Sequence, residues 1–127
     1  MEDRYLFKAK HFDEWHIGNI VKEPSGLYIR DIKENVMASI DDESTICQCT
    51  GLRDKNGKLI LENDIMVAHL DEDYPEDETY IRVLWYESGF CSKEKGSEDI
   101  SPIDKFDQEH FEVCGNIFDN PELLESE

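Results

Sequence analysis

The sequence predicts a mainly β protein, with a small SH3-like β-barrel in its C-terminal region, an N-terminal β-hairpin region and minimal helix. Three observations predict this class. About eight short stretches with strand character recur between turn signals, a pattern typical of small barrels and sandwiches. Asn56-Gly57 lies between two of them and is a strong hairpin signal, because both residues tolerate the positive φ of a type I′ turn. Asn63-Asp64 forms a second turn just before an apolar run that begins at Ile65, an order that suits an SH3-like barrel.

The N-terminal region, residues 1–45, predicts a hairpin and a third short strand. Residues 5–10 and 15–21 alternate between two sets of side chains, as strands do when one face is buried. A turn follows, and residues 27–30 return the chain as a strand. Residues 31–45 are acidic and weakly patterned, so we expect a boundary between residues 45 and 46.

The C-terminal region, residues 46–127, predicts the barrel. Its strands are expected at residues 46–50, 59–61, 65–70, 80–86, 90–92 and 111–118. Pro75 excludes a central strand from the charged segment before residue 80. Single helical turns are expected at Ser101-Pro102 and, capped by Asn120, at residues 120–124.

Six residues are expected to serve these turns and reversals: Gly51, Asn56, Gly57, Asn63, Asp64 and Gly115. Replacing Gly57 with Val should therefore destabilise or unfold the protein and should not remove one activity selectively.

The negative charge is concentrated in the second half of the chain. The net charge is −18, of which residues 64–127, with 19 acidic and four basic residues, carry −15. Binding of nucleic acids depends on Lys and Arg, so this field disfavours direct binding to nucleic acid or to anionic membranes. It favours a basic protein partner. No apolar run approaches the roughly 20 residues that a membrane span needs, and the chain start does not resemble a signal peptide. We expect a soluble intracellular protein.

Cysteines and carboxylates offer weak candidates for a metal site. Cys47, Cys49, Cys91 and Cys114, with His69 or His110, could supply zinc ligands, but Cys-x-Cys is not the usual knuckle and the other two cysteines are isolated. Packed or surface thiols are the simpler interpretation. The segment that begins at Asp54 lacks the ligand pattern of a calcium loop. The acidic stretch 71–78 could bind a cation loosely, but a solvated run of charge is the simpler interpretation. No motif for a nucleophile, phosphate loop or metalloprotease is present, so we expect no enzyme, metal or cofactor.

An interaction face is predicted around the strand at 80–86. Alternation places Tyr80, Arg82 and Tyr86 on one face, with Trp85 on the opposite, core-facing side. Exposed aromatic residues on small barrels can line a groove for a partner. The expected interaction face combines these residues with the acidic stretch before them: Tyr80, Arg82, Tyr86, Asp71, Glu72, Asp73, Glu76, Asp77 and Glu78.

Three blocks of the chain resemble the YopX family of small phage proteins. Residues 50–65 resemble its central motif, residues 112–124 its ending, and Phe7, Trp15 and Gly18 the landmarks of its N-terminal hairpin. Asn63 stands where the family usually has Gly, and Cys49 and Cys114 stand where it has aromatic or aliphatic residues. The resemblance implies the same C-terminal architecture and a phage or prophage setting, hence the cytoplasm of a bacterial host. The family has no assigned activity.

The sequence therefore predicts a non-enzymatic protein-interaction module with an acidic surface. Three alternatives stay open. The first is a DNA-mimic inhibitor of a host nucleic-acid-binding protein. The second is a self-assembling structural protein, since strand edges can pair between subunits as a homo-oligomer. A third is an enzyme or metal-dependent module with an unfamiliar fold.

Overall fold

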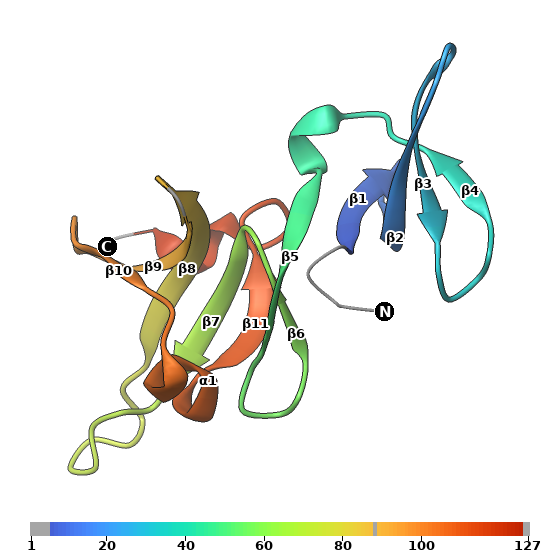
Figure 1. The fold of residues 1–127 in the computed structure, drawn as a ribbon. Coiled ribbons are helices and arrows are strands. Elements are labelled where there is room, and N and C mark those ends of the chain that lie inside the picture. The colour runs from blue at the N-terminus through green and yellow to red at the C-terminus, as the bar shows by residue number, and fades with distance from the viewer. Residues whose placement is uncertain (1–5, 88, 126–127) are drawn as a thin grey trace.

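The strands form two antiparallel sheets (Figure 1) in a computed structural model that describes residues 6–87 and 89–125. The six-stranded sheet has the order β4-β3-β2-β1-β5-β6. Its strands are β1 (Phe7–His11), β2 (Glu14–Glu23), β3 (Gly26–Asp31), β4 (Met37–Ser39), β5 (Cys47–Arg53) and β6 (Leu59–Leu61). The five-stranded sheet has the order β10-β9-β8-β7-β11. Its strands are β7 (Asp64–Ala68), β8 (Thr79–Tyr86), β9 (Gly89–Glu94), β10 (Ile100–Pro102) and β11 (Glu112–Asn116).

Helix is confined to short segments. A 3-10 turn, η2 (Glu43–Thr45), precedes β5, and another, η3 (Pro121–Leu124), follows β11. The helix α1 (Lys105–His110) begins at Asp104, whose carboxylate accepts the Asp107 N–H in a capping box. This start lies after the predicted turn at Ser101-Pro102, which instead ends β10. The turn after Asn120 is confirmed, but Asn120 makes no side-chain cap.

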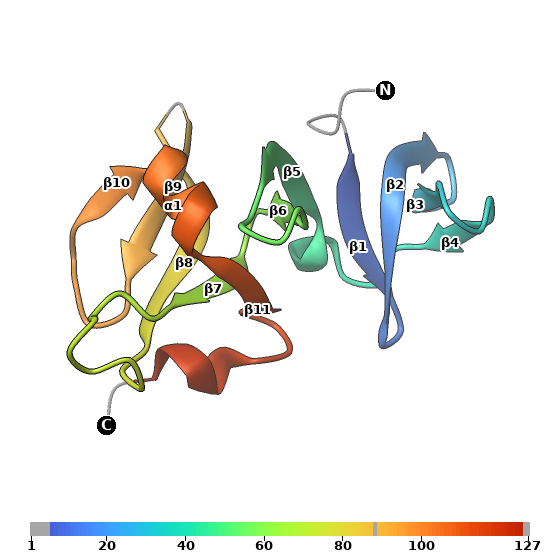
Figure 2. The same cartoon turned by 90° about the horizontal axis from the view of Figure 1, so that it is seen from below.

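The mainly β class is confirmed, whereas the SH3-like barrel is not. The strands of the described chain form two open sheets and no closed barrel. The reason is the placement of β5, which pairs with β1 through Phe7 opposite Gln48 and Lys8 opposite Cys47. Figure 2 shows β5 and β6 between the first four strands and the remaining five. The boundary expected between residues 45 and 46 is therefore crossed by the β1–β5 pairing.

Much of the core lies where these sheets pack, and a separate cluster of Ala9, Ile29 and Ala38 lies within the six-stranded sheet. The largest cluster joins Ile60 of β6 to residues of β7 and β8 and to Phe111, which precedes β11: Ile60, Met66, Ala68, Ile81, Val83 and Phe111. A second cluster contains Leu6, Cys49 and Leu61. Because β6 contributes to both, its three residues connect the two halves of the molecule. No helix of the described chain is long and apolar enough to span a membrane.

The predicted turn residues divide into two groups. Three of them lie in turns: Asn56, Gly57 and Asn63. A type I′ turn at Asn56-Gly57 would need a positive φ at both residues, but only Gly57 has one, at 82°. The type I′ prediction is therefore wrong. The buried Asp54 carboxylate accepts the N–H groups of Asn56 and Lys58, each at 2.9 Å, and so holds a loop that does not require positive φ at Asn56.

The other three turn predictions fall inside strands. Gly51 lies in β5 and Gly115 in β11, each at a shift in strand register. Such bulges insert an extra residue without ending the strand. Asp64 begins β7 and is only 2% exposed.

Candidate functional site

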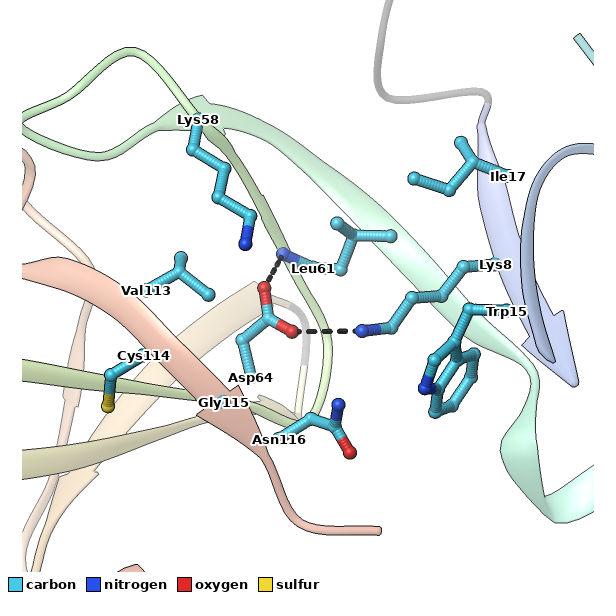
Figure 3. Close-up of a pocket in the computed structure, with 10 residues that line it drawn as sticks. All are labelled: Lys8, Trp15, Ile17, Lys58, Leu61, Asp64, Val113, Cys114, Gly115 and Asn116. Atoms are coloured by element: carbon cyan, nitrogen blue, oxygen red, sulfur yellow. Dashed lines mark hydrogen bonds and ion pairs between the residues drawn. The ribbon is translucent and has the colours of Figure 1, made fainter. Parts of the chain in front are cut away.

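A pocket of about 340 Å³ lies at the junction of the two sheets (Figure 3). Pockets between packed units are frequent ligand sites, and this volume is at the lower end of their range of about 300–1,000 Å³. The hairpin β1–β2 supplies three of its residues, and the segment from β6 to β7 and strand β11 supply most of the others. The lining residues are Lys8, Trp15, Ile17, Lys58, Leu61, Asp64, Val113, Cys114, Gly115 and Asn116.

A buried ion pair spans the pocket. The Lys8 Nζ lies 3.2 Å from Asp64 Oδ1, and both residues are buried. The other Asp64 oxygen accepts the Leu61 N–H at 2.8 Å. Burial raises the pKa of the Asp64 carboxyl, and the Lys8 charge opposes that effect. The Lys8 ammonium also lies 4.5 Å from the centre of the Trp15 ring, a cation–π contact.

A second ion pair at the same junction involves Asp119, beyond the end of β11. Lys10 Nζ lies 2.6 Å from Asp119 Oδ1, and the Trp15 indole N–H donates to Oδ2 at 2.6 Å. Asn116 donates to Oδ2 at 3.1 Å. The hydrogen bonds from Lys10 and then Trp15 lower the pKa of Asp119 to about 2. The hairpin is thus held against the C-terminal segment by charge-assisted bonds.

The replacement Asp119→Asn should change how stability depends on pH. A carboxyl with a lower pKa in the folded than in the unfolded chain stabilises the fold above its unfolded pKa, about 3.9 for Asp. This contribution is lost as the pH falls toward the folded value of about 2. Urea unfolding should therefore show a wild-type advantage over Asp119→Asn at pH 5 that shrinks toward pH 2. Asp13→Asn, in an exposed turn, is the control; an advantage over Asp119→Asn that stays constant with pH would contradict this role.

The polar groups of the pocket are largely engaged with one another. Both Asp64 oxygens are occupied, and the Cys114 thiol donates to the Ile65 carbonyl at 3.4 Å. Although Cys114 is exposed as a residue, partial desolvation of its thiol is the main cause that raises its pKa, which lowers its fraction of nucleophilic thiolate. Lys58 extends into the pocket toward Asp64 in Figure 3. The arrangement is suited to holding two sheets together by buried charge.

The acidic stretch forms an exposed, ordered loop between β7 and β8, named here the acidic loop (residues 71–78). Asp71 Oδ1 accepts the N–H groups of Asp73 and Tyr74 at 2.9 and 3.3 Å, and the Asp77 N–H donates to the Tyr74 carbonyl at 3.0 Å. Tyr74 is 58% exposed. The structure therefore places the six predicted acidic residues in one exposed, hydrogen-bonded loop that also contains Tyr74.

The remaining residues of the predicted interaction face do not all join the acidic loop. Tyr80 and Arg82 are half-buried in β8, whereas Tyr86 is exposed at the end of that strand. Figure 1 shows that the loop leaves one end of β8 and that the turn to β9 lies at the other. Trp85 is 49% exposed, so its predicted place in the core is wrong. Near the strand end it packs instead against Phe90, with ring centres 4.8 Å apart.

The cysteines occupy separate places. Cys47, Cys49 and Cys91 are buried and Cys114 is exposed. Burial raises the pKa of Cys47 to about 11. Among the described residues, the one group of three side chains close enough to share a metal ion contains no cysteine: His16, Asp31 and Glu34.

Sequence reasoning missed that group, because no metal-ligand spacing connects His16 to Asp31 and Glu34. His16 Nδ1 lies 2.8 Å from Asp31 Oδ2, and Asp31 Oδ1 accepts the N–H groups of Lys33 and Glu34. Burial alone would raise the pKa of Asp31, but the hydrogen bonds from Glu34, His16 and Lys33 lower it overall. These bonds account for the buried carboxylate as a cap on the turn after β3.

Comparisons with known proteins agree on one family and one fold. The family model described as YopX protein matches residues 9–125. The crystal structure of protein EF1440 from Enterococcus faecalis is 22% identical and covers 95% of this chain and 97% of its own, with a TM-score of 0.53. The crystal structure of protein YopX from Bacillus subtilis is 18% identical and covers 98% of each chain, with a TM-score of 0.60. No curated protein matches the chain. At these identities the two structures show a shared fold.

Proposed function

The chain belongs to the YopX family, and we propose that it is a non-enzymatic protein-interaction module that binds a basic protein partner through its acidic loop. We further propose a phage or prophage origin and a place in the cytoplasm of the bacterial host. The observation that carries the proposal is the loop itself, an exposed segment that contains six carboxylates and the exposed Tyr74.

The carboxylates of the acidic loop are available to a partner. Within the described chain, their only ion pair is between Glu78 and His69, at 4.0 Å. The other five carboxylates are exposed, and no cation of residues 6–87 or 89–125 lies within that distance of them. Charge of one sign at the tip of a loop increases the rate of association with an oppositely charged surface, and the effect weakens with salt. Tyr74 adds apolar contact area of the kind that is enriched at protein interfaces.

Neutralising the acidic loop should remove binding of the basic partner. The variant Glu72→Gln/Asp73→Asn/Glu76→Gln/Asp77→Asn leaves Asp71, which holds the loop backbone, unchanged. The matched control removes four negative charges from exposed residues elsewhere: Glu23, Glu98, Glu122 and Glu125, each replaced by Gln. Both variants and the wild type are immobilised, and proteins retained from host extract at low and high salt are quantified by mass spectrometry.

The expected result is a basic protein retained by the wild type and the control at low salt and reduced about tenfold or more on the loop variant. Direct titration of that purified protein then gives its dissociation constant for each variant. Equal retention by all three proteins would contradict the proposal, and so would an equal loss on both variants, because total charge and not the loop would then govern binding.

A further inference from the structure

A cluster of cations lies on one face of the strongly acidic half of the molecule. Residues 64–127 contain only four basic residues, and three of them, Arg82, Lys93 and Lys95, border one hollow of about 120 Å³. Arg82 of β8 is directly opposite Lys93 of β9, and the Lys95 N–H donates to the Tyr80 carbonyl at 2.9 Å. Since directly opposite residues share a face of the sheet, the three side chains project from the same face. Glu94, Gly96 and Leu124 complete the hollow.

These three cations have no ion-pair partner among the described residues. Lys8, Lys10 and Lys105 each form an ion pair with a carboxylate. Across residues 6–87 and 89–125, no carboxylate lies within 4.0 Å of the charged nitrogens of Arg82, Lys93 or Lys95. Several other basic residues of the described chain also lack an ion pair, so the distinguishing feature of these three is that they border one hollow. Lys95 also lies 5.6 Å from the centre of the Tyr80 ring, a cation–π contact.

The geometry of the cluster is unfavourable without a counter-ion. Like charges directly opposite each other on neighbouring strands destabilise a sheet. Arg82 is fixed in place because its Nη2 donates to Asn63 Oδ1 at 3.1 Å, and its Nε is buried with no hydrogen-bond partner. A buried donor without an acceptor is also unfavourable. An anion in the hollow would reduce the repulsion and offer an acceptor to the guanidinium.

We propose that this hollow is a binding site for a single phosphate group. Three cations match the charge of a phosphate monoester, which is about −1.5 to −2 at pH 7. A volume of 120 Å³ is below the range of about 300–1,000 Å³ for whole small-molecule ligands, so it suits one oxyanion group. The net charge of −18 repels a phosphate polymer, but this repulsion is screened beyond a Debye length of about 8 Å at physiological salt. The site is separate from the acidic loop and does not depend on the function proposed for that loop.

The test titrates the whole protein with inorganic phosphate, phosphoserine and acetate at constant pH and ionic strength. Binding is followed by NMR shifts of the backbone amides of residues 80–82 and 93–95 and by the thermal midpoint. The site variant is Lys93→Gln/Lys95→Gln. The matched control is Lys55→Gln/Lys105→Gln, which removes two charges from exposed lysines elsewhere.

Inorganic phosphate and phosphoserine should shift those amides and raise the thermal midpoint of the wild type and the control. The site variant should bind them at least about tenfold more weakly, since it loses two charge-assisted contacts. Equal affinity for inorganic phosphate and phosphoserine would assign the site to the free ion. Tighter binding of phosphoserine would assign it to a phosphorylated ligand. Both results support the proposal of a phosphate site.

Three results would overturn the proposal. The first is acetate binding as strongly as phosphate, because the site would then select no phosphate group. The second is unchanged binding by the site variant, and the third is equal weakening by the control. Without phosphate, the site variant should be no less stable than the control, because it loses the repulsion between Arg82 and Lys93. A larger loss of stability in the site variant would show that the cations are compensated within the protein. That result would also count against the site.

Discussion

Replacing Asp64 with Ala is expected to lower the free energy of unfolding by about 3–5 kcal/mol, as is typical when one partner of a buried ion pair is removed. The Lys8 ammonium would remain buried without its counter-ion, and the Leu61 N–H would lose its acceptor. Because typical domains are stable by only about 5–15 kcal/mol, this loss should be visible as a fall in the thermal midpoint and in the urea midpoint. The pair joins β1 to β7, so the damage should extend to the contact between the sheets.

The double variant Lys8→Met/Asp64→Leu separates the charge effect from the loss of packing. Replacing a buried ion pair by apolar side chains of similar size is often neutral or stabilising. The double variant should therefore recover at least half of the stability lost in Asp64→Ala, although the Leu61 N–H stays without its acceptor. A loss below about 1 kcal/mol in Asp64→Ala would instead be typical of a solvated surface pair, and the junction would not depend on this contact.

Asp64 also shows what local sequence patterns leave undetermined. Asn63-Asp64 has the chemistry of a turn, and Asn63 does occupy one with φ of 71°. The burial of Asp64, however, is decided by Lys8, which lies 56 residues earlier. Alternation in the first strand correctly separates Lys8 and Lys10 from Phe7 and Ala9. It does not reveal that the lysine face packs against a second sheet through Asp64 and Asp119, and local chemistry has no signal for that pairing.

Strands with strong alternation or apolar runs could be predicted, and strands defined by their neighbours could not. The segments expected at 65–70, 80–86 and 90–92 correspond to β7, β8 and β9. The three-residue strands β4 and β10 are too short to show alternation and form by pairing with β3 and β9. The exposure of the acidic loop could be predicted because carboxylates are rarely buried without partners. The cluster of Arg82, Lys93 and Lys95 could not be predicted, since it depends on the strand register that places Arg82 opposite Lys93.

Replacing Gly18 with Ala is expected to be as damaging as the loss of Asp64, for a steric reason. A Cβ at Gly18 would overlap the carbonyl oxygen of Arg30 and would lie 2.7 Å from its carbonyl carbon and 3.2 Å from the Ile32 nitrogen. All three are main-chain atoms, so relief requires β2 and β3 to separate where Gly18 is opposite Asp31. We expect a loss of more than about 3 kcal/mol, at or above the usual range for overpacking. A Gly within a strand often marks such a close approach.

Gly57→Ala is the matched comparison, because the substitution is identical and only the environment differs. A Cβ at Gly57 would meet nothing within 4 Å, so its penalty comes from the φ of 82° alone. Left-handed backbone costs about 1–2 kcal/mol for a residue with a Cβ, and the predicted effect is therefore a moderate loss with the fold retained. Urea unfolding of the two variants should rank Gly18→Ala well below Gly57→Ala. The reverse order would mean that the loop conformation at Asn56-Gly57, and not the close contact of β2 with β3, limits the stability of this fold.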